Sequence, residues 1–472
     1  MYAKQVLFDQ LTPIGVYKKL KERFSDEISL LFESAINSEK GNYSFIFIGA
    51  TQRVTYKDGQ TTILNEDGTS VTQQNNPFEY LKSYYKDIKT EKYLELSRKL
   101  NVGFTDGFVG FIGYDSVKIF EPVLKPYMDH LEDELHTPDL DLIRPKLTIA
   151  FSHKTNILTL LTPHEELGKE LSELINYLKE PYTYIDIKTT SIDPQKGNFA
   201  FSKEQFFDMV HKSKEMIKSG DVFQILMSNR FTQYAKIDPL SFYRVLRSQN
   251  PSPYMFLLEF EDFTIAGSSP EVMVGLHDNH ILLRPIAGTR RRGKTPQRDL
   301  ELAKEMLEDE KECAEHLMLV DLGRNDVGRV AKSGSVKVTE MMRVERYSHV
   351  MHMVSDIDAL LDDKYDMFDL FAATFTAGTM TGAPKIRAME LIAEYENLKR
   401  GFYSGAVGYF GFDGNMDSAI AIRTAYLDDE KIVFQAGAGI VADSQEELEY
   451  LEVHNKLAAN LSSLEKLNAT KK

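Results

Sequence analysis

Four short apolar runs lie close together in the middle of the chain, near residues 254–260, 263–267, 272–276 and 280–285. Consecutive parallel strands need a crossover connection of about a dozen or more residues, and the gaps between these runs are much shorter. The runs therefore predict an antiparallel meander and not a series of strand–helix–strand units.

Strand patterns and helix patterns occupy separate stretches in the rest of the chain. Residues 1 to about 190 alternate short strands with polar turns. Helix patterns follow near residues 202–218, 299–320, 366–375 and 384–395. Strands in runs and helices in blocks predict an α+β fold. A polar segment at 189–197 is the expected boundary between an N-terminal domain, residues 1–190, and a C-terminal domain, residues 197–472.

The composition limits the class of partner and the compartment. With 42% hydrophobic residues among 472, the chain can bury large cores. Its net charge of −15 argues against a broad nucleic-acid surface, which needs clustered Lys and Arg. The single cysteine, Cys313, excludes an internal disulfide, and the first residues lack the apolar core of a signal peptide. The chain has no run of about 18 apolar residues, the length needed to span a membrane. We therefore expect a cytoplasmic protein with no nucleic-acid or membrane partner.

The stretch 435–456 suits an anionic ligand. An apolar run before it predicts a strand, after which Gly437 and Gly439 allow the backbone to turn and to approach a ligand closely. An acidic helix follows, on which Glu449 and Glu452 are three residues apart and share a face. A glycine turn, a carboxylate pair and a lysine one turn further on would hold an anionic substrate through a metal ion.

Two other interpretations of this stretch stay open. Residues 437–442 match the dinucleotide fingerprint G-x-G-x-x-A. That motif needs a further strand with an acidic residue about 20 residues on, whereas the following residues predict a helix and a polar tail. The acidic residues also fit a solvated helix face.

A second acidic pair, Glu312 and Glu315, shares a face of the helix pattern near 299–320, where a solvated face is again the alternative. Two such helices facing each other would present four carboxylates to one Mg²⁺, which keeps several waters and shares ligands with anionic substrates. The Gly/Thr loop at 376–385 offers N–H groups and hydroxyls to a carboxylate. His352, if it lies beside such a polar site, could move a proton.

Five motifs occur together in the order of one enzyme family. They are Pro-Ile-Ala-Gly-Thr-Arg at 285–290, Glu-His-Leu-Met-Leu-Val-Asp-Leu at 315–322, Gly-Thr-Met-Thr-Gly-Ala-Pro-Lys at 378–385, Gly-Ala-Gly at 437–439 and the Glu-x-x-Glu-x-x-Asn-Lys run at 449–456. The set resembles the chorismate-utilising enzymes, closest to their anthranilate synthase component I branch. The resemblance is dense over residues 200–460 and thinner before them. It implies largely antiparallel β-sheets packed as a sandwich with helices outside.

The resemblance implies a metal site on the two acidic helices. Glu315 and Glu452 match the positions that hold Mg²⁺ in the family. Glu312 and Glu449 match supporting positions that act through water. Since the metal binds the ring carboxylate of the substrate there, chorismate is the implied substrate and Mg²⁺ the implied cofactor.

The resemblance also assigns catalytic and substrate-binding roles. Glu271 matches the general acid that protonates the departing C4 hydroxyl, because hydroxide is a poor leaving group. His352 matches the histidine of the later pyruvate loss. The implied substrate contacts are Gly288, Thr289, Thr379, Tyr403, Arg423, Gly437, Ala438, Gly439 and Lys456.

Two positions separate the branches of the family. Isochorismate and salicylate synthases carry a water-activating lysine where this chain has Gln224, whose neutral amide cannot act as that base. Aminodeoxychorismate synthases often carry a nucleophilic lysine where this chain has Ala287. The resemblance therefore implies a lyase (EC 4.1.3.27) that aminates chorismate at C2 with ammonia and expels pyruvate to give anthranilate, the first step of tryptophan biosynthesis. The alternatives are aminodeoxychorismate synthase component I, and a catalytically silent sensor of tryptophan or chorismate.

A feedback site and a partner subunit are implied as well. Residues 31–34 resemble the family's L-L-E-S element, with Phe32 in the second leucine position, and residues 250–256 resemble its counterpart. Together they form a tryptophan-inhibitor site in the family, although a purely structural contact is the alternative. The implied tryptophan contacts are Ser34, Pro253, Tyr254 and Met255. Ammonia implies a separate glutamine amidotransferase subunit, since Cys313 lies in a helix pattern without the context of a nucleophile.

Overall fold

The structure, a computed structural model, describes residues 1–34, 43–347 and 350–469. Up to residue 196 its elements are β1 (Tyr2–Leu7), α1 (Pro13–Arg23), β2 (Ser29–Glu33), β3 (Tyr43–Lys57), β4 (Gln60–Asn65), β5 (Ser70–Gln73), α2 (Pro77–Lys86), α3 (Thr90–Leu100), β6 (Gly107–Ile112), η1 (Tyr114–Ser116), α4 (Val117–Phe120), η2 (Pro122–Leu124), α5 (Lys125–Met128), β7 (Leu140–Ser152), β8 (Ile157–Thr162), α6 (Glu165–Lys179) and η3 (Pro194–Lys196). The later elements are β9 (Gly197–Phe199), α7 (Lys203–Ser219), β10 (Gln224–Tyr234), α8 (Pro239–Gln249), β11 (Tyr254–Glu259), β12 (Thr264–Ser269), β13 (Val272–His277), β14 (His280–Leu283), β15 (Ile286–Arg291), α9 (Pro296–Glu308), α10 (Glu310–Gly328), β16 (Lys337–Arg346), β17 (Val350–Leu360), α11 (Met367–Thr374), η4 (Gly378–Met380), β18 (Gly382–Ala383), α12 (Lys385–Glu396), β19 (Ala406–Gly411), β20 (Met416–Ile420), β21 (Thr424–Leu427), β22 (Lys431–Ile440) and α13 (Glu446–Lys466).

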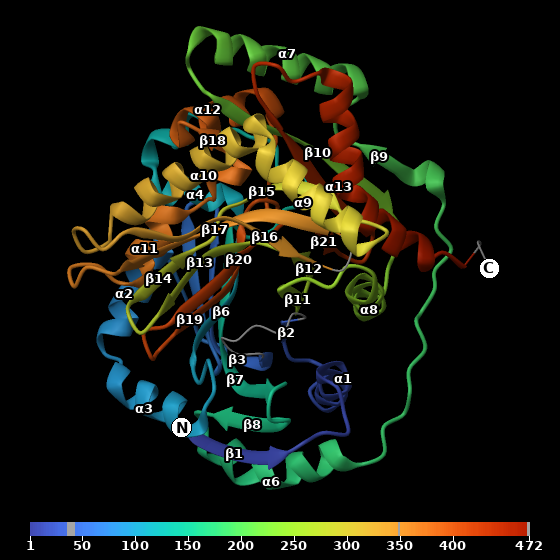
Figure 1. The fold of residues 1–472 in the computed structure, drawn as a ribbon. Coiled ribbons are helices and arrows are strands. Elements are labelled where there is room, and N and C mark those ends of the chain that lie inside the picture. The colour runs from blue at the N-terminus through green and yellow to red at the C-terminus, as the bar shows by residue number, and fades with distance from the viewer. Residues whose placement is uncertain (35–42, 348–349, 470–472) are drawn as a thin grey trace.

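The four central apolar runs form the strands β11 to β14, as the sequence predicted. β11 pairs antiparallel with β12, and β13 pairs antiparallel with β14, so the runs make two hairpins. β12 then continues the pairing to β21, and β13 continues it to β20. Helices lie outside the strands, with α6 at one end of the molecule and α7 at the other (Figure 1). The expected α+β fold with antiparallel sheets and outer helices is confirmed.

Two hydrophobic cores lie on opposite faces of the strands. Leu30 pairs with Phe47 across β2 and β3, and both side chains enter one core. Leu31 pairs with Ile46 one position on, and both enter the other core. This follows from the alternation of side chains along a strand. Side chains of α2 and α11 join the strands in the first core, whereas the second is covered by α1, α6, α7, α8, α12 and α13.

Strands from both sides of the expected domain boundary pair with each other. β2 lies between β3 and β11, with Glu33 opposite Met255. β6 lies between β7 and β19, with Phe111 opposite Val407. Between α6 and β9 the chain runs along the outside of the molecule as an extended connection (Figure 1). The division into residues 1–190 and 197–472 stays a prediction.

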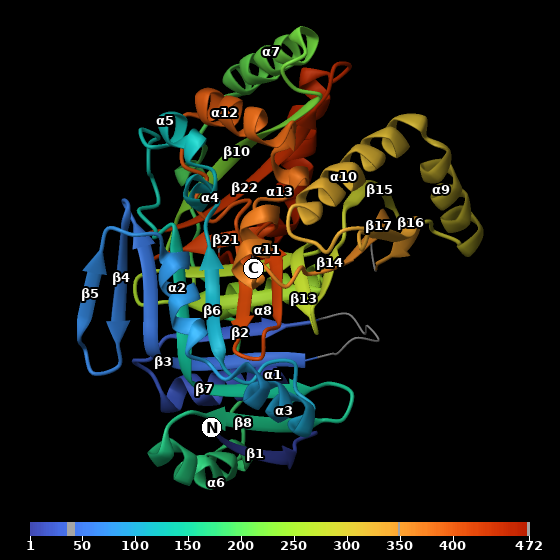
Figure 2. The ribbon, with the colours of Figure 1, turned by 90° about the vertical axis from the view of Figure 1, so that its left-hand side faces the viewer.

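The acidic helix predicted near 299–320 is in fact two helices, α9 and α10, which lie to one side of the sheets beside β15 to β17 (Figure 2). Asp309 separates them in an extended conformation. Its carboxylate accepts hydrogen bonds from the backbone N–H groups of Lys311 and Glu312, both over 3.1 Å. An aspartate in this position favours the start of a new helix. α10 then continues to Gly328, beyond the end that the sequence predicted.

Over the part of the chain that the structure describes, none of the helices has both the length and the apolar character needed to cross a bilayer.

Candidate active site

The glycines of the 435–456 stretch lie in a strand. Gly437 and Gly439 belong to β22, opposite Ser228 and Leu226 of β10. The predicted turn is therefore wrong, because pairing with β10 keeps this backbone extended up to Ile440. The predicted close approach to a ligand stays a prediction, and protein side chains lie close to both glycines. A Cβ atom on Gly439 would lie 2.7 Å from Gln224 Nε2, and one on Gly437 would lie 3.1 Å from the Tyr403 hydroxyl.

The carboxylates of α10 and α13 gather beside these glycines. Gln224 Nε2 donates a hydrogen bond to Glu315 Oε1 over 3.3 Å. Burial raises the pKa of Glu315, and the charges of Glu452 and Glu312 raise it further. Burial and the charge of Glu452 also raise the pKa of Glu449. The two predicted acidic pairs thus face each other closely enough for their charges to interact, and they are not two separate solvated faces.

Two cations partly neutralise this cluster. Lys456 Nζ lies 2.7 Å from Glu452 Oε1 and donates to the Gly437 carbonyl over 2.9 Å. Arg290 pairs with Glu312 through one carboxylate oxygen, Oε1. The other oxygen of Glu312, Oε2, is buried without a hydrogen-bond partner.

The carboxylate cluster is suited to a hydrated Mg²⁺ ion. Among the described residues no three acidic, histidine or cysteine side chains are close enough to form a ready-made metal cage. Mg²⁺ does not need one, because it binds through one or two carboxylates, water and an anionic ligand. All-oxygen donors, mutual repulsion and the orphaned Glu312 Oε2 fit a small hard cation.

Glu271 lies in the turn between β12 and β13 with its carboxyl group buried. Thr379 Oγ1, from the η4 turn, donates to Glu271 Oε1 over 2.8 Å. Burial raises the pKa of Glu271 to about 7, against the opposing effects of the Thr379 hydrogen bond and of the charges on Lys456 and Arg423. At neutral pH a substantial fraction of this carboxyl therefore carries a proton.

His352 lies on β17 opposite Thr289 of β15. Its Nδ1 is 3.2 Å from the Gly288 carbonyl and 3.0 Å from Thr289 Oγ1. Because a carbonyl oxygen only accepts, Nδ1 carries the proton and Nε2 keeps its lone pair. Burial, with the nearby Arg423 charge, lowers the pKa of His352 to about 4, so the ring is neutral at pH 7.

Of the remaining predicted substrate contacts, Arg423 and Tyr403 lie beside the residues already described, whereas the side chain of Ala438 does not. Arg423 has a left-handed backbone (φ +50) and lies close enough to Glu271 for their charges to interact. Tyr403 is buried, and burial raises the pKa of its hydroxyl, so it stays protonated. Ala438 differs, because its methyl group packs in the core under the helices, on the face of β22 away from Gln224.

The chorismate binding enzyme model matches residues 29–462. The chain belongs to that family. A relative from Aquifex aeolicus named anthranilate synthase component 1 is 42% identical over 98% of this chain and 94% of its own length. A relative of the same name from Lactococcus lactis is 38% identical over 96% of this chain and 97% of its own length.

One solved structure agrees with this family membership, and a second shows the shared fold. The crystal structure of anthranilate synthase component I from Streptococcus pneumoniae TIGR4 superposes with a TM-score of 0.78 at 34% identity, over 90% of this chain and 93% of that one. The menaquinone-specific isochorismate synthase from Escherichia coli has the same fold, with a TM-score of 0.73 at 17% identity, over 98% of this chain and 94% of that one.

The two segments expected to form the family's feedback site are neighbours. β2 pairs with β11, which brings Ser34, one residue past Glu33, close to Met255. Glu33 is buried and accepts hydrogen bonds from Tyr243 (2.7 Å) and from Arg247 Nε (2.9 Å). Pro253 and Tyr254 are half-buried, and the Tyr254 hydroxyl donates to Asp417 over 3.1 Å. Sequence reasoning missed Tyr243 and Arg247, whose helix α8 carries no motif.

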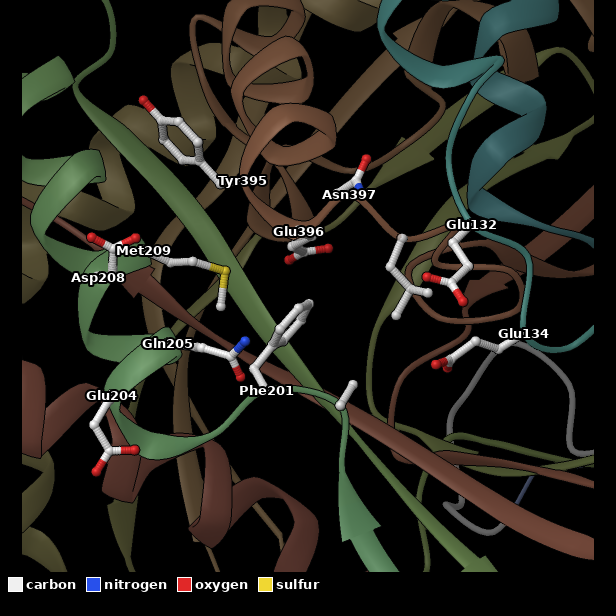
Figure 3. Close-up of a pocket in the computed structure, with 12 residues that line it drawn as sticks. Glu132, Glu134, Phe201, Glu204, Gln205, Asp208, Met209, Tyr395, Glu396 and Asn397 are labelled. Carbon is white, nitrogen blue, oxygen red and sulfur yellow. The ribbon is translucent and has the colours of Figure 1, made fainter.

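A pocket of about 520 Å³ lies at the start of α7 and the end of α12 (Figure 3). None of the predicted active-site residues is among the residues that line it. Its walls include Glu132, Glu204, Asp208, Tyr395 and Glu396. Sequence reasoning did not identify any of them, because they come from three distant stretches with no shared motif.

Proposed function

We propose that the protein converts chorismate and ammonia into anthranilate, pyruvate and water, the reaction of an anthranilate synthase. The observation that carries this proposal is the 42% identity with the Aquifex aeolicus anthranilate synthase component 1 along nearly the whole of both chains. A conserved fold alone would not suffice, since related folds host different reactions.

Charge complementarity supports the binding of a dianion. The charges of Lys456 and Arg423 both act on Glu271, and within the described residues the guanidinium of Arg423 makes no hydrogen bond or ion pair. A guanidinium forks onto two carboxylate oxygens, so Arg423 would hold the enolpyruvyl carboxylate. Glu315 and Glu452, supported by Glu312 and Glu449, would hold Mg²⁺, which would neutralise the ring carboxylate.

Glu271 would act as the general acid of the first step. Ammonia forms a bond to C2, the two ring double bonds shift from C1=C2 to C1=C6 and from C5=C6 to C4=C5, and the C4–O bond breaks. The leaving hydroxyl takes a proton from Glu271 and departs as water. The proton that the new ammonium group loses balances the one that Glu271 donates. A carboxyl whose pKa is raised to about 7 is suited to this task, because it is partly protonated at the working pH and still gives up its proton readily.

His352 would act in the second step. Loss of pyruvate removes the proton from C2, breaks the C3–O bond and restores the aromatic ring, and the methylene of the leaving group gains a proton. The Nδ1–H bond to Gly288 leaves the Nε2 lone pair available, so the neutral ring can accept a proton. Thr289 accepts from the same Nδ1 and steadies the ring.

Two residues favour ammonia over other nucleophiles. Gln224 has a neutral amide that cannot deprotonate water, whereas ammonia needs no base. Its Nε2 bond to Glu315 also leaves Oε1 buried without a hydrogen-bond partner, and that oxygen can accept from ammonia. Ala287 has no group that could form a covalent adduct.

A glutamine amidotransferase subunit would supply the ammonia in a cytoplasmic heteromer. The relatives' name, component 1, supports a second component. Free tryptophan would inhibit through Ser34 and Pro253 to Met255, as feedback on the pathway that the product enters.

Product fluorescence tests the proposal. We expect the purified protein with chorismate, Mg²⁺ and ammonium ions to form fluorescent anthranilate with an equal amount of pyruvate. An aminated product without pyruvate would instead identify aminodeoxychorismate synthase component I. No consumption of chorismate would refute both enzymes and leave the sensor.

A further inference from the structure

We propose that Arg400 is a positioning residue of this site, whose guanidinium holds the η4 turn, strand β10 and the Tyr403 ring in fixed relation to one another. The inference rests on the proposed function, because it names the group that keeps the general acid and the Gln224 amide in place.

Arg400 is among the largest fully buried side chains of the protein, with 1% of its surface exposed. Its Nη1 donates to the Met380 carbonyl over 2.9 Å, and its Nη2 donates to the Leu226 carbonyl over 2.9 Å. Nε and Nη2 also donate to the two oxygens of Glu396, over 2.8 and 2.7 Å. The guanidinium thus joins the η4 turn, the end of α12 and strand β10.

Both backbone carbonyls lie next to groups that the reaction needs. Met380 follows Thr379, whose hydroxyl donates to Glu271 over 2.8 Å. Leu226 lies two residues after Gln224 on β10 and opposite Gly439. A shift of either carbonyl would move the acid's hydrogen-bond donor or the amide that contacts Glu315.

The guanidinium also fixes an aromatic ring. Arg400 Cζ lies 5.7 Å from the centre of the Tyr403 ring and 4.9 Å from that of Tyr114. The Tyr403 hydroxyl borders Gly437. Tyr114 N–H donates to the Gly401 carbonyl over 2.8 Å, so residues from before the extended connection support the same group.

Glu396 makes the arrangement rigid. It is 3% exposed, and its Oε1 accepts from both the backbone N–H and the hydroxyl of Ser228, each over 2.8 Å. The same side chain also lines the 520 Å³ pocket (Figure 3). A lysine at position 400 would keep the charge and lose the planar fork, so it could not reach two carbonyls and both carboxylate oxygens together.

The test is Arg400→Lys, with steady-state kinetics of anthranilate formation across pH. The wild-type protein is run first, and absence of product there would refute the proposed function and this inference with it, whereas an effect confined to the variant bears on this inference alone. For the variant we expect kcat to fall at least about tenfold, as for a misplaced reacting group. We also expect the alkaline limb of the kcat profile to move to higher pH, because a displaced Thr379 no longer stabilises the Glu271 carboxylate. Lys456 and Arg423, the other charges near Glu271, are unchanged.

Arg144→Lys is the matched control. Arg144 makes a two-pronged pair with buried Asp106, with distances of 3.1 and 2.6 Å, in the N-terminal strands far from the site along the chain. We expect a comparable loss of thermal stability with wild-type kcat and wild-type pH profile. Wild-type kinetics in a folded Arg400→Lys protein would overturn the inference and leave Arg400 a structural residue.

Two further variants keep the inference falsifiable if Arg400→Lys does not fold. Tyr114→Leu removes the ring beneath the guanidinium and keeps all of its hydrogen bonds, so we expect a smaller shift of the alkaline limb in the same direction. The double variant Tyr114→Leu/Thr379→Val should show no more shift than Thr379→Val alone. Additive shifts, or none with Tyr114→Leu, would overturn the inference.

Discussion

Thr379 Oγ1 donates a hydrogen bond to Glu271 Oε1 over 2.8 Å, and this bond opposes the effect of burial on the pKa of that carboxyl. Burial favours the protonated acid, whereas a donated hydrogen bond favours the carboxylate. Burial dominates, and the pKa of Glu271 is raised to about 7. Since the protonated form is the proposed general acid, we expect the rate to decline as pH rises through this value.

Replacing Thr379 with valine tests this balance. The change removes the hydroxyl and keeps the shape, so the pKa of Glu271 should rise further and the alkaline limb of kcat should move to higher pH. KM for chorismate should rise as well, since Thr379 is an expected substrate contact. Thr374→Val, on α11, is the control, because that hydroxyl bonds only the backbone of its own helix. An unmoved limb with Thr379→Val would contradict the prediction.

Glu271→Gln tests the acid itself. Without a dissociable proton, the C4 hydroxyl must leave unaided, and we expect kcat to fall by about 10²- to 10⁴-fold with little change in KM. Stopped assays of chorismate consumption measure both constants. Glu27→Gln, which affects only a Lys146 ion pair at the N-terminal strands, should retain full activity. A loss of less than tenfold would remove Glu271 from the role of acid.

Gly439→Ala tests the close approach of β22 to Gln224. A Cβ atom at this position would lie 2.7 Å from Gln224 Nε2, so the amide must shift, which disturbs its hydrogen bond to Glu315. We expect about a 10²-fold loss of kcat/KM for ammonium, in line with a misplacement of about 1 Å. Gly328→Ala is the control, because nothing lies within 4 Å of its added methyl group. Equal activity of both variants would contradict the prediction.

Local signals in the sequence located the strands well and the long-range contacts poorly. The central hairpins follow from apolar runs with short gaps, and β11 begins at Tyr254 as expected. The break at Asp309 was missed because helix formers surround it on both sides, and only its capping bonds reveal the boundary. Gly437 was assigned to a turn because glycine permits either conformation, and pairing with Ser228, over 200 residues away in sequence, decides it.

The acidic pairs show the same limit at the site. Spacing put Glu312 with Glu315 and Glu449 with Glu452, yet it could not distinguish a solvated face from a half-buried cluster between two helices. The effect of Glu452 on the pKa of Glu315 comes from the packing of two helices far apart in sequence. Arg400 and Glu396 form an ion pair four residues apart, a spacing that is also common among exposed ion pairs. The sequence does not show that this pair is buried, as the structure does.

Glu452→Gln tests the cluster as a Mg²⁺ site. The amide keeps the shape and removes one charge, so the pKa of Glu315 and of Glu449 should fall, because the Glu452 charge raises both. Mg²⁺ affinity should nevertheless weaken, by about 10- to 100-fold, since a ligand charge is lost. Titration calorimetry of the protein with Mg²⁺ alone measures this without turnover. Glu447→Gln, on the same helix but paired with Lys203, should bind Mg²⁺ normally. Equal affinities would contradict a site on α13.

Ser34→Ala tests the expected tryptophan site at the junction of β2 and β11. We expect tryptophan to inhibit the wild-type protein. The variant should need about five- to tenfold more tryptophan for the same inhibition, which corresponds to the loss of about one hydrogen bond. Basal kcat and KM should not change, because Ser34 lies at the β2–β11 junction beside Glu33 and is not one of the expected chorismate contacts. Ser29→Ala, at the other end of β2, is the control, since its hydroxyl bonds only the Glu27 carbonyl. Inhibition curves at fixed chorismate measure the effect. Identical curves for the two variants would mean that the strand junction is a structural contact between the two halves of the chain, and an uninhibited wild type would mean that this chain lacks the feedback.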